Sequence, residues 1–206
     1  QIATDLGYPR YSEFWTWDNR VKIFIYPQKD SFLKATHQPS WSEGMADYTS
    51  KQIRSYSWSQ GFVDSLLPHE MAHLVFRDFV GFKGEVPLWL DEGVAQWSEE
   101  AKRRLVKDYA RQQYGQAYFL SFRDMMRIDL HRLAPSDKVK IERMISASGD
   151  KTDVYVTKDE LINTYYVQAV SMVGFLIDRY GAGSFAEFCR QLRDGKSMEE
   201  ALRFSY

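Results

Sequence analysis

The segment that most restricts the fold is residues 66–76, LLPHEMAHLVF, where two histidines and a glutamate interrupt an apolar run. Apolar residues recur with a helical period as far as Gly81, and Pro68 fits either the first turn or a kink. Residues four apart on a helix share one face. We therefore expect His69 and His73 to point the same way from a largely buried helix.

Two neutral imidazoles on one helix face can bind the same divalent ion. Glu70 is rotated by about 100° from His69, so it can lie beside a metal-bound water and act as its base. Zinc lowers the pKa of such a water from about 15.7 to roughly 7, which suits a carboxylate base near neutral pH. The competing interpretation is two core histidines and a surface glutamate, but a chain with 4 histidines seldom forms this pattern by chance.

A catalytic zinc ion usually has three protein ligands, so a third donor must come from elsewhere in the chain. His37 and His131 are candidates, although neither stands at a short spacing after the histidine pair. Glu92 is the better candidate, because it follows an apolar stretch inside a helix predicted at 87–105. A carboxylate beside a buried stripe is costly unless a cation receives it. Its neighbour Asp91 has no assigned role.

Two further residues of the predicted helix at 87–105 could support such a site. Glu99 lies two turns after Glu92 and could accept a hydrogen bond from the free ring nitrogen of a ligand histidine. The favoured interpretation of Glu99 is nevertheless an exposed glutamate. Gly93 is expected to let this helix pack closely against the helix that carries the histidines.

The remaining elements place the strands early and most helices late in the chain. Periodicity and cap residues predict strands at 20–26 and 49–58, the second exposed or at a sheet edge, and helices at 30–36, 122–130, 158–180, 184–194, after Pro135 and from Met198. This order indicates the α+β class. We expect a single domain over 1–206, with a small mixed β-sheet and the histidine helix in a lobe at about 1–81, and a helical lobe at about 82–206.

Composition excludes several classes of protein. Of the 206 residues, 44% are hydrophobic, which is enough for one sizeable core, and the net charge of −1 provides no basic field for nucleic acid. The single cysteine, Cys189, excludes an intramolecular disulfide. No apolar run approaches the roughly 18 residues of a membrane-spanning helix. The chain begins at Gln1 rather than at methionine, so we expect a processed or trimmed form.

The motif and its surroundings resemble the gluzincin metallopeptidases. His69-Glu70-x-x-His73 is followed, after eighteen residues, by Glu92 in W-L-D-E-G-x-A, which is similar to W-L-N-E-G-F-A of the aminopeptidase N family. The stretches LLPHEMAHLVF, PLWLDEGVAQW and YYVQAVSMVGFLIDRYG resemble more closely the small peptidase MA-like domains of bacteria. The match covers about residues 60–100 and 160–182.

This resemblance implies a zincin-like fold, a Zn²⁺ ion and a peptide or protein substrate. The two histidines and Glu92 would hold the ion, and Glu70 would activate a zinc-bound water that hydrolyses the peptide bond. The family also has a tyrosine that stabilises the oxyanion. Tyr166 matches its register here, and Tyr165 is the adjacent alternative.

One departure from the family concerns the amino end of the substrate. The aminopeptidases carry G-x-M-E-N, whose glutamate holds a free amine, whereas residues 43–47 read EGMAD, where only Asp47 could replace it. An endopeptidase-like cleft is therefore the simpler expectation, with a peptide paired along a strand near 51–56.

The alternatives are a catalytically silent peptide-binding domain and a zinc hydrolase of a non-peptide substrate on the same fold. Cleavage specificity, exo- or endo-cleavage and oligomeric state stay open. The location is not determined either, and the expectation is a bacterial protein whose full-length form is exported or membrane-anchored.

Overall fold

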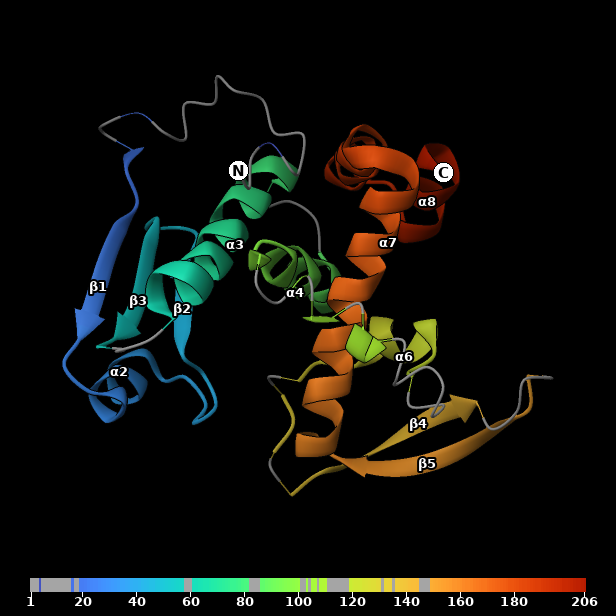
Figure 1. The fold of residues 1–206 in the computed structure, drawn as a ribbon, viewed down its shortest axis with the longest axis horizontal. Helices are drawn as coiled ribbons and strands as arrows, with labels where there is room; N and C mark the ends of the chain where they lie inside the picture. The colour runs from blue at the N-terminus through green and yellow to red at the C-terminus, as the bar shows by residue number, and fades with distance from the viewer. Residues whose placement is uncertain are drawn as a thin grey trace.

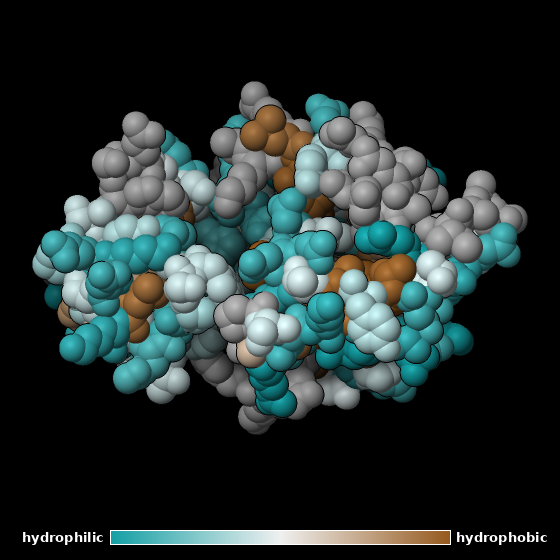
Figure 2. Space-filling view, turned by 90° about the horizontal axis from the view of Figure 1, so that it is seen from below, coloured by the Kyte–Doolittle hydropathy of each residue, from teal (hydrophilic) through white to brown (hydrophobic). Residues whose placement is uncertain are grey.

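The structure is a computed structural model that describes residues 4, 16, 19–57, 61–81, 86–100, 103, 105–106, 108–110, 119–130, 132–134, 136–144 and 149–206. This part of the chain has a mixed α+β fold, with two small sheets and the longest helices between and after them (Figure 1). The α+β class predicted from the sequence is confirmed. Figure 2 shows one face of the molecule, on which hydrophilic residues prevail and the hydrophobic ones form small separate groups.

The N-terminal sheet has three strands in the order β1-β3-β2, and its elements are β1 (Lys22–Tyr26), α2 (Lys29–Thr36), β2 (Gly44–Asp47) and β3 (Gln52–Tyr56). β1 runs parallel to β3, and β2 runs antiparallel to it. β3 is therefore the central strand, and the edge position predicted for residues 49–58 is wrong. Its alternation reflects one buried face, on which Ile53 and Ser55 are inaccessible to water, rather than an unpaired edge.

The strand at the edge next to the helices is β2, which the sequence did not predict. Its residues, GMAD, include no β-branched or aromatic side chain, so they carry little strand propensity. β2 is held in place by its antiparallel pairing with β3, a contact that only the folded chain provides.

The helix that carries the two histidines is α3 (Leu67–Val80), and it ends at Gly81 (φ 83°) as predicted. A short π-helical segment, Phe62–Leu66, precedes it. Pro68 is the second residue of α3, directly after this segment. The apolar face of α3 packs in the core through Ala72, Val75, Phe76 and Phe79.

The second helix of the site, α4 (Leu88–Trp97), begins after Pro87 as predicted but ends at Trp97 instead of continuing to 105. The hydroxyl of Ser98 donates to the carbonyl oxygen of Val94, at a distance of 3.1 Å. Such a bond competes with the backbone pattern of a helix. Helical conformation resumes at residue 100, so a turn separates two helical pieces that the sequence pattern joins.

The C-terminal half contains a hairpin as well as helices. Its elements are α6 (Phe122–Arg127), β4 (Lys138–Met144), β5 (Lys151–Thr157), α7 (Lys158–Arg193) and α8 (Met198–Ser205). The helix predicted after Pro135 is wrong: charged residues alternate there with β-branched ones, and the ion pair of Lys140 with Asp153 (2.7 Å) joins the two strands. α7 is broken at Gly181 (φ 88°), which agrees with the two helices predicted on either side.

Gly93 lets α4 approach α7 rather than α3. A Cβ at this position would lie 2.6 Å from the carbonyl oxygen of Ala169 and 2.7 Å from Cγ2 of Val173, both on α7. The expectation that Gly93 serves the contact with the histidine helix is therefore wrong. α4 lies between α3 and α7, and its orientation is set on both sides (Figure 1).

Candidate metal centre

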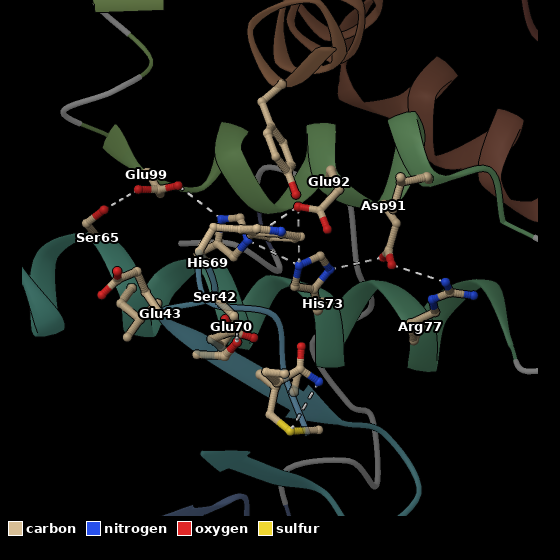
Figure 3. Close-up of a pocket in the computed structure, with 18 of the residues that line it drawn as sticks. Ser42, Glu43, Ser65, His69, Glu70, His73, Arg77, Asp91, Glu92 and Glu99 are labelled. Atoms are coloured by element: carbon tan, nitrogen blue, oxygen red, sulfur yellow. Dashed lines mark hydrogen bonds and ion pairs between the residues drawn. The ribbon is translucent and has the colours of Figure 1, made fainter. Parts of the chain in front are cut away.

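A cavity of about 450 Å³ is lined by β2, α3 and α4 (Figure 3). The side chains in its wall that can bind a metal ion or exchange a proton include His69, Glu70 and His73 from α3 and Glu92 from α4. Its apolar lining comes from Trp41, Met45, Leu66 and Leu88. Polar groups that converge within a partly apolar cavity are typical of a binding site.

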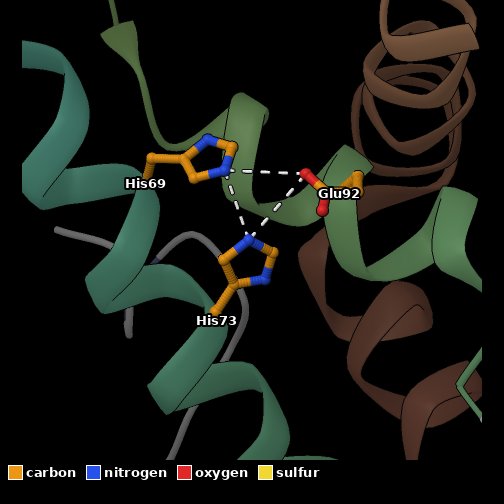
Figure 4. A group of neighbouring side chains, drawn as sticks. All are labelled: His69, His73 and Glu92. Carbon is orange, nitrogen blue, oxygen red and sulfur yellow. Dashed lines mark hydrogen bonds and ion pairs between the residues drawn. The ribbon is translucent and has the colours of Figure 1, made fainter. Parts of the chain in front are cut away.

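The three predicted ligands converge on one point of this cavity (Figure 4). Nε2 of His69 lies 3.2 Å from Nε2 of His73, and Oε2 of Glu92 lies 3.6 Å and 3.9 Å from these two nitrogens. A tetrahedral zinc ion with bonds of about 2.0–2.1 Å holds its ligand atoms roughly 3.3–3.5 Å apart. The three donor atoms therefore fit one ion, and no other such group occurs within the described ranges.

Glu99 holds the ring of His69 from behind. Nδ1 of His69 lies 3.0 Å from Oε1 of Glu99, which is 1% exposed, and the hydroxyl of Ser65 donates to the other carboxylate oxygen (Figure 3). The favoured interpretation of Glu99 as an exposed glutamate is therefore wrong, and the contact with His69 that the sequence allowed is present, although α4 ends before Glu99 and the helical register behind that argument does not apply. The contact occupies Nδ1 and leaves Nε2 for a metal ion.

Asp91 has the corresponding place behind His73, a role that the sequence did not reveal. Its Oδ1 lies 3.2 Å from Nδ1 of His73, an ion-pair contact, and among the described residues neither atom has a hydrogen bond of normal geometry, not even with the other. Burial alone would raise the pKa of Asp91, but the positive charges of His73 and Arg77 outweigh it and lower this pKa to about 2. The one available signal was a second carboxylate next to Glu92 in an otherwise apolar stretch.

Glu70, which the sequence predicts as a base, lies beside the cluster. Its side chain is 5% exposed and lines the same cavity. A Cβ on Gly44 of β2 would lie 2.9 Å from Oε1 of Glu70, so the glycine leaves room for the carboxylate. Burial raises the pKa of Glu70 against the opposing attraction of the two histidines. A raised pKa brings the carboxylate closer to the range in which it can exchange protons at neutral pH.

Of the two candidate tyrosines, Tyr166 reaches the cavity. Tyr166 is one of its lining residues, and burial, with the negative charge of Glu92, raises its pKa. Tyr165 is fully buried in the core, and its hydroxyl donates to the carbonyl oxygen of Met125 at 3.1 Å. The geometry therefore places Tyr166, and not its neighbour, near the candidate metal centre.

Other residues considered from the sequence are not part of the cluster. His37 is exposed at the end of α2. Oδ1 of Asp47 accepts the N–H groups of Thr49 (3.0 Å) and Ser50 (3.1 Å) in the turn after β2, which occupies this carboxylate. His131 lies outside the described residues.

The carboxylates around the two histidines predict a steep pH dependence of metal binding. Burial alone would lower the pKa of His69, but hydrogen bonds with Glu92 and Glu99 outweigh it and raise this pKa to about 10. The pKa of His73 is also raised, against burial, by Asp91. Nε2 of His69 and Nε2 of His73 lie 3.2 Å apart, so one of them can hold a proton that faces the other, and an incoming metal ion must displace this proton. We expect the apparent zinc affinity to rise roughly tenfold per pH unit between about pH 6 and pH 9.

Competition titrations with a chromophoric chelator at several pH values measure this dependence. Glu99→Gln removes one cause of the raised pKa of His69, so the dependence should become shallower in that variant. An apparent zinc affinity that does not change with pH over this range contradicts the prediction.

Comparisons of the chain with family models, with curated proteins and with solved structures found no match. None of the helices in the described part combines the length and the apolar character that a membrane crossing needs. The geometry by itself defines a mixed α+β protein in which two histidines and a glutamate could hold a metal ion.

Proposed function

We propose that this chain is a zinc-dependent metallopeptidase of the gluzincin type with a zincin-like fold. The observation that carries the proposal is the convergence of His69, His73 and Glu92, whose donor atoms lie within 4.8 Å of one another, in the cavity that Glu70 also lines. Two imidazoles and one carboxylate are a ligand set that hydrolytic zinc sites use. The presence of the base together with the ligands favours an enzyme over a silent peptide-binding domain.

A zinc ion held by these three side chains would polarise the scissile carbonyl and lower the pKa of a water molecule. Glu70 accepts one proton from this water on a carboxylate oxygen while the water oxygen bonds to the carbonyl carbon. The same group then delivers the proton to the leaving nitrogen as the carbon–nitrogen bond breaks. The hydroxyl of Tyr166 donates a hydrogen bond to the carbonyl oxygen as negative charge develops there.

A peptide substrate fits along β2 rather than along residues 51–56, where the sequence placed it. β3 pairs with β1 on one side and with β2 on the other, so it has no free edge. β2 ends the described sheet, and its residues Gly44, Met45 and Ala46 line the cavity. An extended chain added at such an edge gains main-chain hydrogen bonds whatever its sequence.

Zinc analysis combined with peptide cleavage tests the proposal. We expect about one zinc ion per chain and cleavage of a mixed peptide library that stops when a chelator is added and returns when zinc is restored. Zinc without cleavage would favour the silent domain or a hydrolase of a non-peptide bond. A purified protein that holds no zinc contradicts the proposal.

Tyr166→Phe is expected to lower kcat by about 10²–10³-fold with little change in KM, because the lost hydrogen bond forms only as the oxyanion develops. Steady-state kinetics on a peptide from the library measure both constants. Tyr165→Phe is the matched control: it loses the bond to the carbonyl of Met125 and should lower Tm while kcat stays near that of the parent. The same kcat in parent and Tyr166→Phe proteins excludes the assigned role.

A further inference from the structure

Each of the two histidines of the metal cluster is backed by a carboxylate. Glu99, behind His69, accepts from the hydroxyl of Ser65, and Asp91, behind His73, is paired with a cation, Arg77 (Figure 3). Arg77 is the one lysine or arginine among the described residues that line the cavity. The chemistry proposed above does not use it.

Arg77 is fixed on two sides. Its Nη2 lies 3.1 Å from Oδ2 of Asp91, and its guanidinium carbon lies 5.3 Å from the centre of the Tyr48 ring. The hydroxyl of Tyr48 also donates to Oδ2 of Asp91, at 3.3 Å. The Arg77 side chain is 22% exposed, so water screens this ion pair less than it screens a surface pair. A guanidinium that is both paired and stacked has little freedom to move.

Asp91 of α4 therefore contacts two residues of α3 that lie one helical turn apart. His73 and Arg77 stand four residues apart on one face of that helix, and both meet the same carboxylate of α4, which is 4% exposed. Arg77 takes one oxygen of Asp91, and the other oxygen faces Nδ1 of His73. Without Arg77, the buried carboxylate would lose its permanent counter-charge and the contact that fixes its rotation.

We infer that Arg77 is a positioning residue for the metal: through Asp91 it orients the ring of His73 so that Nε2 faces the ion. This inference rests on the proposed zinc site, because the orientation matters only where Nε2 is a ligand. Loss of a contact behind a ligand histidine typically weakens metal binding by about 10–100-fold. A substrate contact made by Arg77 would instead change KM and leave zinc binding as it was.

The zinc dissociation constant of Arg77→Met, measured by chelator competition on metal-free protein, tests the inference. We expect it to be about 10–100-fold larger than that of the parent. Arg77→Lys restores the charge without the planar, stacked group, so its zinc binding should lie between the two. Arg190→Met is the matched control, because Arg190 also pairs with a carboxylate, Glu187 (2.8 Å), and lies over a ring, Phe79 (6.0 Å), but does not line the cavity.

A double variant shows whether Arg77 acts through Asp91. In an Asp91→Ala background, Arg77→Met should have no further effect on the zinc dissociation constant, because both oxygens that Arg77 and His73 contact are already removed. If folded Arg77→Met protein binds zinc within about twofold of the parent, the inference is overturned while the zinc site stands; where that variant is too unstable to titrate, Arg77→Lys decides by the same limit. A parent protein that binds no zinc removes the proposed function itself.

Discussion

Glu70→Gln is expected to keep its zinc and to lose peptide cleavage by about 10²–10⁴-fold. Glutamine has nearly the volume of glutamate, so it fits beside Gly44, but its amide cannot take a proton from water. The zinc content should equal that of the parent, because the ligand group does not include Glu70. Zinc analysis and kcat/KM on the same preparation measure the two effects separately.

Glu43→Gln is the matched control for this loss of charge. Glu43 lines the same cavity, but its carboxylate is bound to Lys29 (2.6 Å) and to the hydroxyl of Tyr56. Turnover by Glu43→Gln should therefore stay within a few fold of the parent. A Glu70→Gln protein as active as the parent would show that some other group is the base.

His73→Ala is expected to remove the metal itself, and the activity with it. The remaining donors, His69 and Glu92, are fewer than the three that hold a catalytic zinc ion. We expect zinc binding to weaken by more than about 100-fold, beyond the effect of losing an outer contact. Chelator competition gives the dissociation constant, and added zinc should not restore cleavage at concentrations that saturate the parent.

His37→Asn is the control for the removal of an imidazole. His37 is exposed and has a positive φ of 55°, a conformation that asparagine tolerates. This variant should bind zinc and cleave peptides as the parent does. Stoichiometric zinc in His73→Ala after dialysis would exclude His73 as a ligand.

The centre of the site could be predicted because it depends on short distances along the chain. The spacing of His69 and His73 fixes their common face once the segment is helical, and that requires only apolar periodicity and a stop at Gly81. Glu92 was predictable from the cost of a carboxylate in an apolar stretch. None of these arguments needs the path of the rest of the chain.

The supporting contacts could not be predicted, because they depend on how the helices cross. Whether Asp91 turns toward His73 depends on the angle between α3 and α4, to which the sequence of either helix gives no guide. The same holds for Gly93, whose small size serves α7. Glu99 reaches His69 from beyond the end of α4, a contact that the sequence allowed but did not favour, and the helical register used to argue for it is wrong.

The errors in the sheets have a related cause. Alternation along a strand reports which face is buried, not how many neighbours the strand has, so β3 looked like an edge although it lies in the centre. In β4, charged residues stand at every second position from Lys138 to Glu142, and ion pairs such as Lys140 with Asp153 join this strand to β5. Strand order and cross-strand pairing depend on contacts between distant parts of the chain, which the local sequence pattern does not specify.

The shortness of β2 limits what such an enzyme could accept. Its four residues, Gly44–Asp47, extend for only about 13 Å at a rise of roughly 3.3 Å per residue. A peptide substrate paired with β2 would form main-chain hydrogen bonds over only a few peptide units, and the rest of the substrate would have to leave the sheet edge. Compact domains would then resist attack, and the points of cleavage would be frayed ends or loops long enough to be drawn out straight.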